Sequence, residues 1–289
     1  MTTDAKATAN TPPNSTDLTL DQLQQVQSKD ALAGQVIVVT GAGDGIGKAA
    51  ALDFASAGAH VVLIGRTQQK LEAVYDQIEA NTQTEPIILP MDLNELTSDA
   101  ALELTHGIEQ TYGRLDGLLL NASVLGDKMS ITQYPPKVWD TVMQVNLNSA
   151  FYLTQALLPL LEAGPHGRVI YTTSSVGRKG RAYWGAYAIS KFATEGLMQT
   201  LADELQNIST VRVHCINPGG TRTAMRAKAY PGEDPLTMPE PSAHMPLYRF
   251  LLSPSSQAFH GISWDARDSL PNKACTPVTD QSTYSRSRL

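Results

Sequence analysis

The sequence has two cysteines, no long apolar run and no excess of positive charge. Cys215 and Cys275 lack metal-type spacing and cannot build a disulfide framework. The six histidines include no His-x-x-x-His pair, so we expect no required metal. No segment approaches the roughly 18 apolar residues of a membrane span, and a net charge of −6 gives no footprint for nucleic acid or an anionic membrane. These absences favour a cytoplasmic protein that acts on a small molecule.

The two ends of the chain differ in composition from its centre. Residues 1–16 are rich in small and polar residues without an apolar core, which argues against a signal peptide and predicts disorder. Residues 18–29 are compatible with a short helix that lies over the sheet edge. We therefore predict a disordered or partly helical extension over residues 1–30. We expect 267–289 to be a flexible tail. No linker or internal repeat divides 31–266, which is predicted as one catalytic domain.

Apolar, β-branched runs alternate with helix-forming segments along the centre of the chain. This alternation predicts an α/β fold, a doubly wound parallel sheet of the Rossmann type with helices on both faces. The predicted strands cover 36–40, 60–65, 86–91, 118–121, 168–173, 211–217 and 261–265. The predicted helices cover 48–56, 68–81, 99–112, 137–161 and 183–205.

A glycine-rich turn, Gly41-Ala-Gly-Asp-Gly45-Ile-Gly47, links the first predicted strand to the first helix. Glycines let the backbone turn tightly and approach a pyrophosphate, whose charge is stabilised at the helix N-terminus. A glycine turn alone is weak evidence, but here a strand precedes it and a helix follows it. The turn therefore predicts a dinucleotide site. The second strand ends in Gly65-Arg66, where an arginine suits a 2′-phosphate and an acid would suit a ribose hydroxyl, so we expect NADP(H) rather than NAD(H).

Polar residues follow several predicted strands at their carboxyl ends. Thr40, Asn121, Ser174 and Asn217 all occupy such positions, and ligands of open α/β sheets bind beyond this edge. Because these four residues are expected at the same edge of the sheet, the sequence predicts a polar site there.

Tyr187 and Lys191 lie four residues apart, on one face of the last long predicted helix. A nearby cation favours phenolate, so Lys191 is expected to lower the pKa of Tyr187 from its usual value near ~10. The hydroxyl of Ser174 or Ser175 would hydrogen-bond the same substrate oxygen, and only one of the two can face it. This set predicts proton exchange with a carbonyl or alcohol oxygen.

Together these motifs resemble the short-chain dehydrogenase/reductase family over about residues 34–265. The segments 174–178, 184–188 and 217–226 are most similar to the YciK-type branch of bacterial oxidoreductases. The residues that carry the family resemblance are Thr40, Gly41, Gly45, Ile46, Gly47, Asn121, Ala122, Asn146, Ser174, Tyr187, Lys191, Asn217, Pro218 and Gly219.

The resemblance implies hydride transfer between NADP(H) and a carbonyl or secondary alcohol. Tyr187 is then the acid and base, and the family spacing selects Ser174 as the oxyanion donor. Lys191 would hold the ribose and Asn146 a proton relay, with Asn148 a rival by composition alone. The implied cofactor contacts are Gly41, Gly45, Ile46, Gly47, Arg66, Asp92, Asn121, Ala122, Tyr187, Lys191, Pro218, Gly219 and Thr221.

Some of these assignments leave alternatives open. Asp92 is expected at the adenine but is also compatible with a turn, and Thr223 is an alternative to Thr221 at the carboxamide. Ser123 stands where the family has glycine. The resemblance also implies a homodimer or homotetramer.

The substrate is expected under the long segment 222–239, a candidate lid. Six basic residues near the pocket suggest an anionic substrate, although solvated surface charge is the more common explanation of such residues. They are Arg178, Lys179, Arg181, Arg222, Arg226 and Lys228. An NADP-binding sensor or scaffold without turnover is an alternative function. A reductase of C=C bonds or a nucleotide-sugar modifier is a further one.

Overall fold

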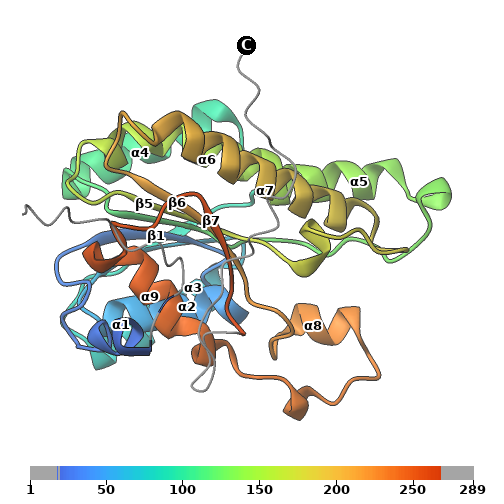
Figure 1. Ribbon diagram of the computed structural model, residues 1–289, viewed down its shortest axis with the longest axis horizontal. Coiled ribbons are helices and arrows are strands. Elements are labelled where there is room, and N and C mark those ends of the chain that lie inside the picture. Colours follow the sequence, from blue (N-terminus) through green and yellow to red (C-terminus); the bar gives the residue numbers. More distant parts are fainter. Residues whose placement is uncertain (1–17, 19, 268–289) are drawn as a thin grey trace, which may run out of the picture.

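In a computed structural model of the chain, residues 18 and 20–267 are described. They form a seven-stranded parallel sheet in the order β3-β2-β1-β4-β5-β6-β7 (Figure 1). The predicted α/β fold is confirmed, and each predicted strand is present within two residues of its expected bounds. The strands are β1 (Val36–Thr40), β2 (His60–Gly65), β3 (Ile87–Pro90), β4 (Gly117–Leu120), β5 (Arg168–Thr172), β6 (Arg212–Asn217) and β7 (Ile262–Asp265).

The central strands are apolar on both faces because helices cover both faces of the sheet. In β1, Val38 pairs with Val62 of β2 on one side and with Leu118 of β4 on the other. All five residues of β1 are buried. From β1 the chain continues to β2 and β3 on one side, and then crosses over to β4 on the other side of β1. The switch point where such folds bind ligands therefore lies between β1 and β4.

Two hydrophobic cores lie on the two sides of the sheet. Phe54, Leu71 and Tyr248 belong to the core on one side, and Leu157 and Met198 to the core on the other. The helices of the first side are α1 (Leu20–Gln25), α2 (Gly45–Ser56), α3 (Gln68–Asn81) and α9 (Met245–Leu252). Those of the second side are α4 (Ser98–Tyr112), α5 (Pro136–Met143), α6 (Ser149–Glu162) and α7 (Gly185–Leu205). Figure 1 shows that α8 (Ala224–Ala229) stands apart from both layers.

Two helices differ from their sequence-based predictions. The helix expected over 137–161 consists of α5 and α6, joined by a π-helical turn at Gln144–Asn148. Helix α9 was not predicted, because it is eight residues long with six of them buried, and an apolar run this short is compatible with either a strand or a helix.

The N-terminal helix packs on α9 rather than on the sheet edge. Leu18, Leu23 and Val26 are buried in the core beside α9. The expected disorder of 1–16 and the flexible tail expected at 267–289, except Arg267, lie outside the described residues. The catalytic domain at 31–266 stays a prediction, and the buried residues before it extend the same core. Across the described part of the chain, no helix combines the length and apolarity that crossing a membrane requires.

Candidate active site

A cavity of about 500 Å³ lies at the carboxyl ends of the strands. It brings together nearly all of the residues singled out from the sequence. Those in its wall are Gly41, Gly45, Ile46, Arg66, Asp92, Asn121, Ala122, Ser174, Tyr187, Lys191, Asn217, Pro218, Gly219 and Thr221. Gly47 and Asn146 are not among the lining residues.

The glycine turn brings the backbone close to the end of β4. A Cβ at Gly47 would lie 2.2 Å from the Gly41 carbonyl oxygen and 2.7 Å from Nδ2 of Asn121. Gly41 and Gly45 have φ angles of 69° and 53°, which side chains rarely adopt. Asp44 caps α2, since its carboxylate accepts a hydrogen bond of 2.7 Å from the Gly45 amide. The turn therefore forms a narrow cradle at a helix N-terminus, which fits a pyrophosphate.

Basic side chains lie at the end of the cavity beyond β2. Arg66 and Lys70 both line it, and the Lys70 ammonium is 2.5 Å from the Asp44 carboxylate. The hydrogen bond from Lys70 lowers the pKa of Asp44 despite partial burial. Asp92 lines the cavity and also closes a turn, since it accepts a hydrogen bond of 2.9 Å from the Asn94 amide. Both expectations for Asp92 are therefore compatible with its position.

The end of β4 is held by Thr40, whose hydroxyl oxygen accepts hydrogen bonds of 3.0 Å from the amides of Asn121 and Ala122. Ser123 follows, and its hydroxyl is buried in the cavity wall without a protein hydrogen-bond partner. A buried, unpaired hydroxyl suits a ligand with polar groups. Together with the glycine cradle, it shows that the cleft fits a dinucleotide.

Tyr187 and Lys191 lie on the buried face of α7, with 8% and 2% of their surfaces exposed. The Lys191 ammonium donates a 2.7 Å hydrogen bond to the Thr172 carbonyl and lies 5.7 Å from the centre of the Tyr187 ring. Burial raises the pKa of Tyr187 to about 12, and a hydrogen bond with Ser174 lowers it in part. Burial also lowers the pKa of Lys191 to about 8. The expected lowering of the Tyr187 pKa is therefore not found in the free protein, where burial of the phenol has the larger effect.

Ser174, rather than Ser175, belongs to the cavity wall, and Ser175 is exposed. The Ser174 side chain caps the short helix Ser175–Gly177 by accepting from the Val176 amide. Gly177 packs against the backbone of Lys191, where an added Cβ would lie 2.8 Å from the carbonyl. The turn after β5 is therefore fixed directly against α7.

Asn146 lies in the π-helical turn, and its side chain is fully engaged. It accepts a 2.8 Å hydrogen bond from the Val124 amide and donates bonds of 3.0 and 3.1 Å to the Val124 carbonyl and the Ser190 hydroxyl. A separate cavity of about 10 Å³ is lined by Asn146 and Lys191. Its volume is close to that of one water molecule.

Arg178, four residues after Ser174, is the centre of a polar network behind the site. It donates to Glu195 (3.2 Å), to Asp265 (2.8 Å) and to Ser263 (2.6 Å). Asp265 in turn accepts a 2.5 Å bond from Asn217. The side-chain oxygen of Asn217 accepts a 3.0 Å bond from the Gly219 amide. The network joins the turn after β5 to the turn after β6.

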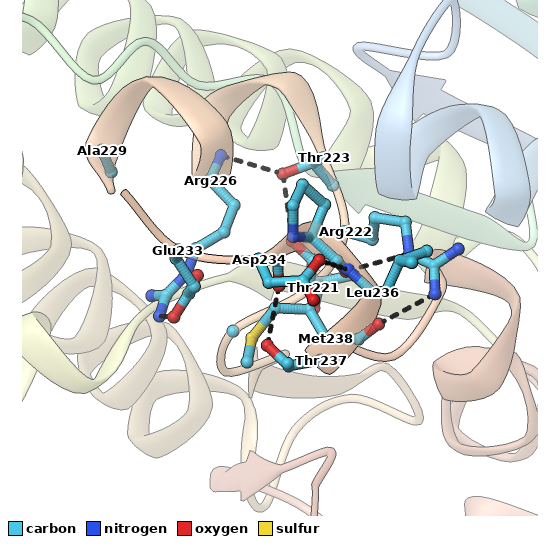
Figure 2. A network of polar contacts seen from close by, with 12 residues as sticks. Thr221, Arg222, Thr223, Arg226, Ala229, Glu233, Asp234, Leu236, Thr237 and Met238 are labelled. Carbon is cyan, nitrogen blue, oxygen red and sulfur yellow. Dashed lines mark hydrogen bonds and ion pairs between the residues drawn. The ribbon is translucent and has the colours of Figure 1, made fainter. Parts of the chain in front are cut away.

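The segment after β6 folds over the cavity through ion pairs of its own (Figure 2). Arg222 contacts Glu240 at 2.8 Å, and Arg226 contacts Glu233 at 2.5 Å. With Arg178 also paired, three of the six basic residues that suggested an anionic substrate face carboxylates. These carboxylates offset the charge of the three arginines, and the anionic substrate stays a prediction that rests on Lys179, Arg181 and Lys228.

The family model for the short chain dehydrogenases matches residues 35–234. The chain belongs to the short-chain dehydrogenase/reductase family. It is 51% identical over 239 residues to the oxidoreductase YciK of Escherichia coli K12, covering 83% of this chain and 94% of that protein. This family member is therefore an oxidoreductase, as predicted.

Solved structures show the same similarity. A short chain dehydrogenase from Shigella flexneri, complexed with NADP, is 50% identical with a TM-score of 0.81, over 83% of this chain and 100% of that one. A short chain dehydrogenase from E. coli CFT073, complexed with NADPH, has the same identity and TM-score, over 83% and 99%.

Sequence reasoning missed several residues of this family member's site. The Thr221 hydroxyl is 3.0 Å from Nε2 of His244, a contact that joins the wall to the segment before α9. Lys128 and Trp184 contact each other beside the cavity, where the Lys128 ammonium lies 4.9 Å from the centre of the Trp184 ring. No motif marks such residues, since their partners lie more than twenty residues away along the chain.

Proposed function

We propose that the chain is an NADP(H)-dependent oxidoreductase of carbonyls and secondary alcohols, with Tyr187 as the acid and base. The main support for this proposal is that Tyr187, Ser174 and Lys191 line the same cavity as the glycine cradle. The two relatives complexed with NADP and NADPH support the choice of cofactor. Bound NADPH would supply the hydride.

The cofactor contacts proposed for this chain follow from the wall of the cavity. The cradle of Gly41, Gly45, Ile46 and Gly47 would hold the pyrophosphate, and Arg66 the 2′-phosphate. The other proposed contacts are Asp92, Asn121, Ala122, Tyr187, Lys191, Pro218, Gly219 and Thr221.

The reductive direction requires Tyr187 to be protonated. With a pKa of about 12, the phenol is protonated at neutral pH and ready to donate to a carbonyl oxygen. Ser174 would hydrogen-bond the same oxygen, and an oxyanion donor of this kind contributes about 3 kcal/mol. The Lys191 ammonium lies close enough to stabilise the phenolate that forms.

Asn146 is proposed as part of the path that returns a proton to Tyr187. The small cavity beside Asn146 and Lys191 has room for a single water between them. The buried Lys191, with a pKa of about 8, exchanges a proton readily near neutral pH.

Self-association into a homodimer or homotetramer is also proposed. Phe151 of α6 and Ile189 and Phe192 of α7 are apolar and between 39% and 44% exposed. A second copy of the chain would cover them. Sedimentation equilibrium tests this, and a monomer at micromolar concentration would contradict it.

The proposed reaction is tested by following NADPH oxidation across aldehydes, diketones, quinones, cyclic ketones and acyl thioesters, with NADH as comparison. We expect turnover with NADPH and a fall in kcat of about 10²- to 10⁴-fold in Tyr187→Phe. Unchanged turnover in Tyr187→Phe would refute the role of Tyr187. Tight NADPH binding without any turnover would favour the sensor or scaffold instead.

A further inference from the structure

Three aromatic rings form a continuous wall at the substrate end of the cavity. The ring centre of Trp184 is 5.8 Å from that of Tyr187 and 5.9 Å from that of Tyr230, with interplanar angles of 48° in both pairs. All three residues line the cavity. Leu125 and Ala229 belong to the same apolar cluster. A substrate whose oxygen reaches Tyr187 would therefore lie against aromatic and aliphatic surface.

Trp184 is held at this wall by a strained turn. Within the described residues, Tyr183 is the only residue other than glycine with positive φ, at 69°. Its ring is 63% exposed, so burial of that ring does not offset the strain. Gly185, the first residue of α7, has a φ of 42°, and an added Cβ there would lie 2.2 Å from the Tyr134 ring. Strained backbone of this kind persists where the surrounding structure needs a particular side-chain placement, here that of Trp184.

The far ring of the wall is fixed by cations that are already engaged. The Arg226 guanidinium lies 3.8 Å from the centre of the Tyr230 ring, and its bidentate partner is Glu233, at 2.5 and 2.6 Å. Lys128 lies 4.7 Å from Tyr230 and donates a 2.9 Å hydrogen bond to the Ala229 carbonyl. Both cations thus hold the wall in place through contacts with the protein.

The acidic partner of Arg226 disfavours an anionic substrate at this end of the cavity. Hydrogen bonding to Glu233 raises the pKa of Arg226, and the same pair lowers the pKa of Glu233. A substrate carboxylate would have to compete with Glu233 for a bidentate contact that already exists (Figure 2). An uncharged substrate group would not have to compete with Glu233.

We propose that the substrate carries its carbonyl on a flat, uncharged aromatic or conjugated ring, which stacks on Trp184. This inference rests on the proposed reductase function, because it places the carbonyl at Tyr187. Trp184 and Tyr230 are then specificity-determining residues. Saturated rings fit the stacking geometry less well, since they have no π face to offer.

The test is a binding comparison that needs no turnover. We would measure binding of three alcohols to the Tyr187→Phe variant in the presence of NADP⁺ by calorimetry. They are 1-(2-naphthyl)ethanol, its fully saturated decalin analogue, and the naphthyl alcohol with a carboxylate on the distal ring. We expect the naphthyl alcohol to bind about tenfold more tightly than the decalin analogue, as aromatic contacts allow. The carboxylated alcohol should bind more weakly than the neutral one.

Variants of the wall separate stacking from general hydrophobicity. In the same Tyr187→Phe background, Trp184→Ala should lose the preference for the naphthyl alcohol, and Trp184→Phe should keep most of it. Trp139 lies outside the cavity wall, so Trp139→Ala is the matched control and should leave the preference unchanged. Unchanged NADP⁺ affinity and circular dichroism would show that each variant is folded.

Three results would overturn the proposal. They are equal binding of the naphthyl and decalin alcohols, tighter binding of the carboxylated alcohol, and no measurable binding of the naphthyl alcohol. The proposed function fails separately, if the unmodified protein reduces no carbonyl while the binding order holds. Turnover that favours aliphatic or anionic carbonyls would retain the reductase and refute the aromatic substrate.

Discussion

Replacing Arg178 with methionine removes one cation from between two carboxylates that are largely buried. The side chains of Glu195 and Asp265 are 7% and 25% exposed, and that of Arg178 is 20% exposed. Breaking a buried ion pair from one side costs about 3–5 kcal/mol, because a charge is left behind without its partner. Since Asp265 is partly solvated, we expect Arg178→Met to lower the free energy of unfolding by about 3 kcal/mol.

Arg222→Met is the matched control for this change. Arg222 also pairs with one glutamate, but its side chain is 35% exposed and that of Glu240 is 62% exposed. Exposed pairs contribute about 0–1 kcal/mol, so the control should be nearly neutral. Urea titrations of both variants, with the slope checked for two-state behaviour, give the comparison. The double variant Arg178→Met/Glu195→Gln should recover part of the loss, since it removes the stranded charge.

The same substitution should also weaken cofactor binding. Asp265 accepts a hydrogen bond from the Asn217 side chain, which in turn accepts one from the Gly219 amide at the cavity wall. A more mobile Asp265 should therefore disturb the turn after β6. We expect a higher KM for NADPH in Arg178→Met and an unchanged one in Arg222→Met. If Arg178→Met cost no more stability than Arg222→Met, the network would have no structural role and the reasoning would fail.

Three further predictions concern the cofactor cradle and the buried lysine. Gly47→Ala should abolish NADPH binding, because the added Cβ would lie 2.2 Å from the Gly41 carbonyl oxygen. The control is Gly196→Ala in helix α7, where an added Cβ meets nothing within 4 Å. It should raise the free energy of unfolding by about 0.5–1 kcal/mol in urea titrations. Arg66→Ala should raise the KM for NADPH by about 10- to 100-fold with little effect on NADH, since a charged hydrogen bond contributes about 1.5–3 kcal/mol. Burial lowers the pKa of Lys191 from 10.5 to about 8, so the unfolded chain binds more protons between these values. Relative to Lys191→Met, stability should therefore rise by about 3 kcal/mol from pH 8 to 10.5, and parallel pH profiles of the two proteins would contradict this.

The sequence predicted the sheet well because apolar strands and alternating helices are local patterns. Thr40 and Asn121 were placed at one edge because parallel strands end together, and the structure joins them by direct hydrogen bonds. The π-helical turn around Asn146 was not predicted, and the Asn146 side chain in it bonds the Val124 backbone, 22 residues away along the chain. Local pattern gave the position of Asn146 in a helix but not the distortion that turns its side chain inward.

Charge was the property that sequence reasoning handled least well. The basic residues near the pocket were recognised as a cluster, but their partners were not. Glu195 is 17 residues from Arg178, and Asp265 is 87 residues away. The pKa of Tyr187 was misjudged for a related reason, since helical spacing fixes how close Lys191 lies but not how much solvent reaches the phenol. Burial is a property of the whole fold and cannot be inferred from an i, i+4 pair.

The connection between β5 and α7 links the chemistry of the site to its selectivity. Ser174 begins this connection and Trp184 ends it, while Arg178 anchors its middle to Asp265. The proposed oxyanion donor and the aromatic wall are thus placed by one short segment. If Arg178 holds that segment, Arg178→Met should reduce both kcat and the preference for aromatic ligands. Since Arg222 lies in the segment after β6, its loss should leave kcat unchanged, and equal effects of the two variants would show that the two segments move as one.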